Sequence, residues 1–183
     1  MAYLKTTNLV KNSYGLGQVL QFITHASGTR VSTTHGTSWA EPSTAYRISI
    51  TPKFTSSTIV VTYYVPFNQA SADSTICVFR AFRIINSGSK EYGLTSAGAT
   101  NANRQIIAGG SGRPVGYDDQ DTDMTNWTVI DLPSSQLAIE YGFETKHSAT
   151  PSNSVAFGQT VNDSTQWGFD TDIVLTAQEV AAQ

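Results

Sequence analysis

Alternation of apolar and polar residues with a period of two dominates this chain of 183 residues, and helical periodicity is hard to find in it. The clearest example is a segment in which Leu137, Ile139, Tyr141 and Phe143 alternate with Ala138, Glu140, Gly142 and Glu144. This pattern predicts a strand with one face in the core and one face in water. We therefore assign Glu140 and Glu144 to the water side.

Other segments repeat this pattern or are denser in β-branched and aromatic residues. Tyr46, Ile48 and Ile50 alternate with polar residues. Thr58 to Val65 and Thr75 to Ile85 are rich enough in such residues to predict central strands covered on both faces. The remaining predicted strands are Gln18 to Thr24, Thr125 to Leu132, Val155 to Phe157 and Asp170 to Thr176. Turn clusters separate the strands, among them Asn86 to Ser89, where we expect glycine to supply a positive φ.

Many strands without crossover helices predict an all-β fold rather than a parallel α/β sheet. We expect a two-sheet antiparallel β-sandwich, jelly-roll-like, over residues 17–183, with an extended N-terminal arm at residues 1–16. The apolar residues of the arm have no strand of their own to join, which makes them candidate assembly contacts: Tyr3, Leu4, Leu9 and Val10. Ser96 to Met124 is too long for a hairpin loop and predicts an excursion that carries contacts.

The charge balance excludes several partners. Only 14% of residues are charged and the net charge is -3, so the surplus of Lys and Arg that nucleic-acid binding requires is absent. Hydroxyl groups supply the polarity instead, with 24 Thr and 20 Ser. Ile76 to Ile85 is the longest mainly apolar stretch and is shorter than the ~20 residues that span a bilayer, so we expect no membrane partner. Met1 to Lys11 shows no secretory signal, which predicts synthesis in a cytoplasm.

No catalytic constellation can be assembled from the sequence. The histidines lack metal-ligand spacing and are interpreted as solvated or hydrogen-bonded loop residues: His25, His35 and His147. Cys77 lies among apolar neighbours and is expected to be a buried, unreactive thiol. We expect no catalytic residue, no cofactor and no enzymatic activity. A polysaccharide depolymerase is the least supported of three hypotheses for the function, after a structural protein and a binding module, because no acid pair in the sequence supports it.

An acidic loop carries the one pattern that approaches a metal site. Asp119, Asp121 and Asp123 repeat the first three ligand positions of a calcium loop. The pattern then fails, because Met124 replaces the glycine and Ile130 replaces the bidentate carboxylate of such a loop. No metal site is therefore assigned. A looser cation site and a solvated acidic loop both stay open for four residues: Asp118, Asp119, Asp121 and Asp123.

Three tryptophans fit either of two roles, core residues or platforms for sugars. Trp127 lies in an alternating segment and is assigned to the core. Trp39 and Trp167 lie among Ser, Thr, Gln and Gly, where packing and partial exposure both stay open. Together with Tyr117 they are the candidate glycan contacts.

Two segments resemble small β-sandwich virion structural proteins of tailed bacteriophages. Gly17 to Gln21 is similar to their G-K-V-L-Q opening, with Gln18 in place of the lysine. Ile48 to Val61 is similar to their I-T-P-x-S-x-x-S-K-I-L-V motif, with Thr58 in place of the lysine. The C-terminal part, Tyr141 to Thr176, also resembles their last strands, so the resemblance covers nearly all of the chain from residue 15 onward.

The resemblance implies a non-enzymatic virion component that is made in the host cytoplasm and displayed as an oligomer, most often a homotrimer. A tail fibre usually carries a coiled-coil or β-helix shaft, and the absence of heptads here favours a capsid decoration (cement) protein. Its partners would be itself and the major capsid protein or other virion proteins, with the arm ordered on assembly across neighbouring subunits. The alternative is a tail fibre or receptor-binding tip that recognises a host surface glycan.

Overall fold

The structure, a computed structural model, describes residues 17–33, 37–69, 77–92, 94, 111–112, 123–147, 155–159 and 170–181. These residues form strands and one short 3₁₀ turn, η2 (Thr44–Tyr46). The strands are β1 (Val19–Ser27), β2 (Val31–Thr33), β3 (Ile48–Ile50), β4 (Thr58–Gln69), β5 (Cys77–Ile85), β6 (Lys90–Glu91), β7 (Ser111–Gly112), β8 (Asp123–Asp131), β9 (Ile139–His147), β10 (Val155–Phe157) and β11 (Ile173–Val180). The predicted arm, residues 1–16, lies outside the described residues. Within the described ranges, no helix is long and apolar enough to cross a membrane.

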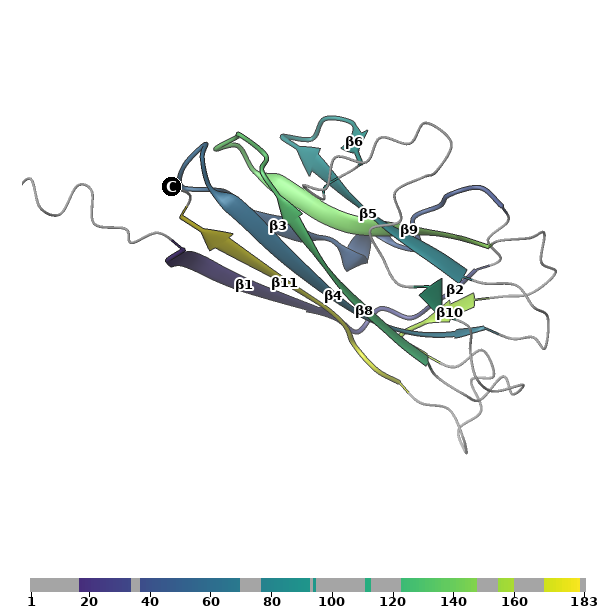
Figure 1. The fold of residues 1–183 in the computed structure, drawn as a ribbon. Helices are drawn as coiled ribbons and strands as arrows, with labels where there is room; N and C mark the ends of the chain where they lie inside the picture. The colour runs from purple at the N-terminus through teal and green to yellow at the C-terminus, as the bar shows by residue number, and fades with distance from the viewer. Residues whose placement is uncertain are drawn as a thin grey trace, which may run out of the picture.

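Antiparallel pairing arranges the strands in two sheets (Figure 1). In the first sheet β4 pairs with β8 on one side and with β11 on the other, and β1 follows β11. β10 and β2 continue this sheet beyond the end of β11. In the second sheet β9 lies between β3 and β5, and β5 also pairs with β6 and β7. The two-sheet antiparallel sandwich is confirmed, and the strand order is compatible with a jelly roll.

Phe143 lies at the centre of the core between the sheets. Its ring stacks on Tyr46 at a centroid distance of 5.9 Å and meets Tyr63 and Trp127 edge-on at 6.4 Å and 6.0 Å. Tyr63 and Trp127 belong to β4 and β8 of the first sheet, so these aromatic contacts join the two sheets. Trp127, predicted to lie in the core, is half-buried and stacks on Tyr63 at 4.6 Å.

The predicted alternation matches the buried positions in β3 and β9. Ile48, Ile50, Ile139, Tyr141 and Phe143 are all buried. Leu137, which shares their parity, is 53% exposed because the strand begins only at Ile139. Cys77 is buried as predicted, and burial raises the pKa of its thiol to about 12, which keeps it protonated.

The two segments predicted to be covered on both faces differ. β5 is covered, since Phe82 and Ile84 on its outward side are buried. β4 is not, because Tyr64 on its outward side is 42% exposed. Composition alone could not separate the two, because β4, the strand richer in β-branched and aromatic residues, is the one with an exposed outward side.

The turn after β5 differs from the sequence expectation in one detail. The positive φ angles fall on Asn86 (48°) and Ser87 (59°), not on glycine. Two consecutive left-handed residues are typical of a type I′ hairpin turn, and asparagine tolerates that conformation better than most residues. Gly88 is instead required by space, because a Cβ atom there would lie 2.9 Å from the carbonyl oxygen of Ile85.

Gly142 of β9 tests how closely this strand packs against Phe82 of β5. A Cβ atom at this position would lie 2.6 Å from the Phe82 ring, which is fully buried against it. We expect Gly142→Ala to lower the free energy of unfolding by about 1 to 3 kcal/mol in a urea titration. Gly28→Ala, whose nearest neighbour would be the Asp172 carboxylate at 3.4 Å, is the control and should cost less than about 0.5 kcal/mol. Equal effects of the two substitutions would contradict the packing.

Candidate functional site

One densely hydrogen-bonded group among the described residues is the carboxylate of Glu179, in β11. The residue is fully buried, on the inward side of the strand with Ile173, Leu175 and Ala177. Its Oε1 accepts hydrogen bonds from the backbone N–H of Lys53 at 2.6 Å and from the Ser57 hydroxyl at 2.6 Å. A buried carboxylate needs such donors because burial removes it from water.

Glu179 also connects the two segments that carry the phage resemblance. The Gln21 side-chain amide donates to Glu179 Oε2 at 2.7 Å and to the backbone carbonyl of Thr51 at 2.8 Å. Gln21 closes the G-Q-V-L-Q segment, whereas Thr51 and Ser57 belong to the segment from Ile48 to Val61. Both motifs therefore meet at one buried carboxylate and serve to fix the β3–β4 turn against β1 and β11.

Sequence reasoning missed Glu179, although a signal was present. The predicted strand was ended at Thr176, whereas β11 continues to Val180. Extending the alternation of Ile173, Leu175 and Ala177 places Glu179 on the buried face. An acidic residue in a buried register marks a carboxylate that must be satisfied by hydrogen bonds.

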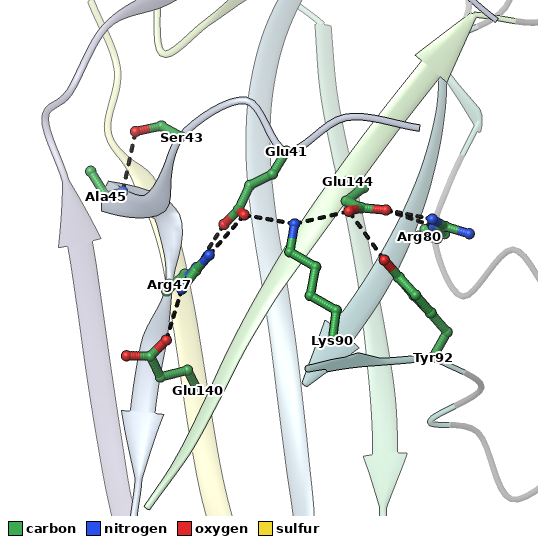
Figure 2. Close-up of polar contacts among 9 residues, drawn as sticks. All are labelled: Glu41, Ser43, Ala45, Arg47, Arg80, Lys90, Tyr92, Glu140 and Glu144. Carbon is green, nitrogen blue, oxygen red and sulfur yellow. Dashed lines mark hydrogen bonds and ion pairs between the residues drawn. The ribbon is translucent and has the colours of Figure 1, made fainter. Parts of the chain in front are cut away.

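A second polar cluster covers the outer face of the second sheet (Figure 2). Its centre is Glu144 in β9, which is only 5% exposed. Arg80 donates to Glu144 Oε2 from Nε at 2.9 Å and from Nη2 at 2.6 Å, while Lys90 Nζ lies 2.9 Å from Oε1. The Tyr92 hydroxyl donates to the same Oε1 at 3.2 Å. Glu144 is thus on the outward side as predicted, but its assignment to the water side is wrong, because these side chains cover it.

Lys90 extends this cluster to a second acidic residue. Figure 2 shows Lys90 between Glu144 and Glu41, and its Nζ lies 2.8 Å from Glu41 Oε2. Glu41 also accepts from Arg47 Nε at 2.7 Å, and Arg47 Nη1 reaches Glu140 at 2.9 Å. Glu140, whose side chain is 46% exposed, does lie on the water side as predicted. The ion pairs tie the segment before β3 to β9 and β6.

Aromatic rings complete the cover of this face. The Arg80 guanidinium lies over the Trp39 ring at 4.4 Å and over the Tyr92 ring at 3.9 Å. Lys146 Nζ also lies over Trp39, at 4.9 Å. Lys90 Nζ lies 4.4 Å from the centroid of the buried Phe82 ring. Trp39, a candidate glycan contact, is half-buried and already engaged by two cations.

A third polar group crosses the core between the sheets. Arg83 Nη1 of β5 donates to Asp131 Oδ1 of β8 at 2.5 Å, and the Tyr141 hydroxyl of β9 donates to Oδ2 at 2.7 Å. Asp131 is 4% exposed. Burial, then the neighbouring Asp131 charge, raises the pKa of Tyr141, so its phenol remains a hydrogen-bond donor.

The pKa shifts of the carboxylates in these clusters favour ion pairs and hydrogen bonds over proton transfer. Burial alone would raise the pKa of Glu144, but hydrogen bonds from Lys90 and Arg80 outweigh it and hold the pKa below its ordinary value. The pKa of Glu41 is lowered in the same way by Arg47 and Lys90. A general acid needs a raised pKa, so neither carboxylate has the property that sugar hydrolysis requires of its acid. Among the described residues no three His, Cys, Asp or Glu side chains gather to hold a metal ion.

The structure describes only some of the residues singled out from the sequence. Outside the described residues lie the arm contacts Tyr3, Leu4, Leu9 and Val10, the candidate glycan contacts Tyr117 and Trp167, and Asp118, Asp119, Asp121 and His35. Asp123 and His147 are terminal residues of β8 and β9. His25 lies in β1 rather than in a loop, and its Nε2 is 2.9 Å from the Ala45 carbonyl oxygen. The prediction of a hydrogen-bonded histidine is confirmed and its placement in a loop is wrong.

The chain is similar to known proteins in structure, but not in sequence. No protein-family model matches the chain, and no curated protein matches it either. Among solved structures, the chain is similar to a chain in the structure of infectious bursal disease virus, Gt strain, with a TM-score of 0.39 and 11% sequence identity. The alignment covers 91% of this chain and 38% of that chain, so this protein spans well under half of its neighbour's length.

Glu179→Gln tests the junction between the resemblance segments. The substitution keeps the shape of the side chain but removes its charge and adds a donor that faces the Gln21 amide. Because hydrogen bonds to a charged group are worth more than neutral ones, we expect the free energy of unfolding to fall by about 2 to 3 kcal/mol. Glu140→Gln, at a half-exposed ion pair, is the matched control and should cost less than about 1 kcal/mol. The junction would be contradicted if urea titrations gave the same loss for both.

Acid sensitivity tests the Glu144 cluster. The pKa of Glu144 is lowered from 4.5, so its stabilising contribution is complete above that value and disappears as the pH falls through the lowered pKa. We expect the unfolding free energy of the wild type to fall between about pH 5 and pH 3, and to fall less steeply in Glu144→Gln. Parallel pH profiles for the two proteins would contradict the cluster's role.

Proposed function

We propose that the protein is a non-enzymatic structural component of a bacteriophage virion, specifically a capsid decoration (cement) protein that forms oligomers on the particle surface. The observation that carries the proposal is the convergence of Gln21, Thr51 and Ser57 at Glu179. The two segments that resemble phage virion proteins are used here as one structural junction. In this chain the residues of both segments therefore act together, because their hydrogen bonds hold β1, the β3–β4 turn and β11 in place.

The polar clusters are consistent with this role. Ion pairs join Glu144 to Arg80 and Lys90 on the outer face of the second sheet. Another ion pair joins Arg83 to Asp131 between the sheets. Such networks fix the strands of a domain that must keep its shape outside the cell. They provide no proton donor or nucleophile with a suitably shifted pKa, so a binding or structural role accounts for them better than a catalytic one.

In this proposal the arm, residues 1–16, holds the protein on the particle. The described chain enters the sandwich at Gly17, whose N–H donates to the Ala181 carbonyl at 3.2 Å, and then forms β1 at the edge of the first sheet. The arm thus joins the domain at a sheet edge. There it can reach the major capsid protein or a neighbouring copy without passing over the core.

Deletion of residues 1–16 tests the proposal. We expect the truncated protein to keep its far-UV circular dichroism spectrum and cooperative unfolding, but to lose co-sedimentation with particles that lack the protein. A full-length variant with Tyr3, Leu4, Leu9 and Val10 changed to serine should lose attachment as well. The matched control, with Lys5 and Lys11 changed to alanine, should retain it.

Undiminished attachment of the truncated protein would contradict this function. Saturable binding of the isolated protein to host cells or surface polysaccharide, lost in Trp39→Ala, would instead support the alternative of a tail fibre or receptor-binding tip. The truncation does not affect that binding, so the two functions give opposite results.

A further inference from the structure

The outward face of the first sheet differs from the outward face of the second sheet, which ion pairs cover. β1, β11, β4 and β8 lie side by side there (Figure 1), and no described element packs over them. We call the outward positions of these strands the threonine face. They are Val19, Phe22, Thr24, Ala26, Val174, Thr176, Gln178, Val180, Thr58, Val60, Thr62, Tyr64, Met124, Asn126, Thr128 and Ile130. None of these residues is Asp, Glu, Lys or Arg.

The strand register places these residues in ordered rows. Thr24 pairs with Thr176, Thr176 with Thr62, and Thr62 with Thr128, so one threonine row crosses all four strands. The hydroxyl groups of Thr62 and Thr128 lie 3.0 Å apart and hydrogen-bond to each other. An apolar row, containing Phe22, Val60 and Ile130 with Gln178 among them, runs beside it. Hydrogen-bonded β-branched side chains have little rotamer freedom, so this surface is rigid.

Exposed apolar side chains concentrate on the threonine face. Nine large apolar residues of the described chain are exposed, and five of them belong to this face: Val19, Phe22, Tyr64, Met124 and Ile130. Their exposed fractions run from 42% for Tyr64 to 59% for Met124. The second sheet shows the opposite behaviour, because ion pairs and cations cover its outer face. Apolar patches on one face, with charge confined to the other, mark an interaction surface.

We propose that the threonine face binds the same face of another copy of this chain, around a symmetry axis that passes near Thr62. Two observations select this partner. A symmetric contact places identical surfaces against each other, which would oppose like charges on a charged face but not on this one. The size also fits. The area follows from the spacing of the four strands and from the rise along β4 between Thr58 and Tyr64. Treated as a flat rectangle, this footprint is about 450 Å² per copy, without the extra area that protruding side chains add.

Two such footprints together reach about 900 Å², and side-chain relief increases this toward the ~1,000 Å² that a specific interface needs. The threonine hydroxyls suit this contact because they donate and accept, and so pair with their own kind. This inference rests on the proposed function and names the surface of a two-fold contact in its oligomer, which is a pairing of copies rather than the homotrimer that the resemblance implies. It is tested on the isolated protein, so its failure is distinguishable from a failure of particle attachment.

Sedimentation equilibrium of the full chain tests the interface. We expect the wild type to self-associate and Thr62→Lys to weaken that association at least about tenfold, because the new charges face each other. Thr24→Lys, at an exposed position of the same row, should act in the same direction with less disturbance of the fold. Ser49→Lys, at an exposed outward position of β3 in the second sheet, is the matched control and should associate like the wild type.

Mixing Thr62→Lys with Thr62→Glu keeps the test independent of folding defects. The two variants should associate with each other more tightly than either does with itself, because opposite charges then meet near the axis. A wild type that remains monomeric at about 100 µM would overturn the proposal. So would association of Thr62→Lys and Thr24→Lys that is as strong as that of the wild type, or a mixture of Thr62→Lys and Thr62→Glu that associates no more tightly than its separate components.

Discussion

The hydrogen bonds of the buried Glu179 carboxylate fix where the distant parts of this chain meet. Removing a carboxylate from water is costly unless donors surround it, so its position specifies the positions of those donors. Here they come from Gln21 in β1 and from Lys53 and Ser57 in the turn between β3 and β4. A non-directional apolar core would tolerate small shifts among these segments. The carboxylate does not tolerate them, and it fixes β11 relative to β1 and to the turn before β4.

The fold was predictable because a period of two survives in nearly every strand. Ile48 and Ile50 of β3 show it, and so do Ile139, Tyr141 and Phe143 of β9, whereas Tyr46 is buried from the 3₁₀ turn η2. Prediction failed where long-range contacts decide burial. Glu144 lies on the outward, polar side of β9, and it is covered because Arg80 and Lys90 reach it from other strands. Glu179 occupies a position of β11 where its neighbours on the same face are apolar, and its burial depends on hydrogen bonds from the distant Gln21, Lys53 and Ser57. No local pattern contains these partners.

The two outer faces of the sandwich differ in charge and in the side chains that they expose. On the second sheet, Arg80, Lys90, Glu41 and Glu144 neutralise one another over the Phe82 ring and leave little for a partner to satisfy. On the first sheet, threonine rows and exposed apolar residues leave a rigid surface without charge. In our proposal, the outer face of the second sheet needs no partner, whereas another copy of the chain covers the threonine face of the first sheet. Such a division suits a subunit that is displayed in a regular array.

Cryo-electron microscopy of the native phage particle tests the central proposal most directly. The account predicts density with the size and two-sheet shape of this domain at regular positions over the shell. The arm should reach a neighbouring subunit, and the threonine faces should lie against one another. Density confined to the tail, or purified particles without this protein, would contradict the assignment to the capsid surface.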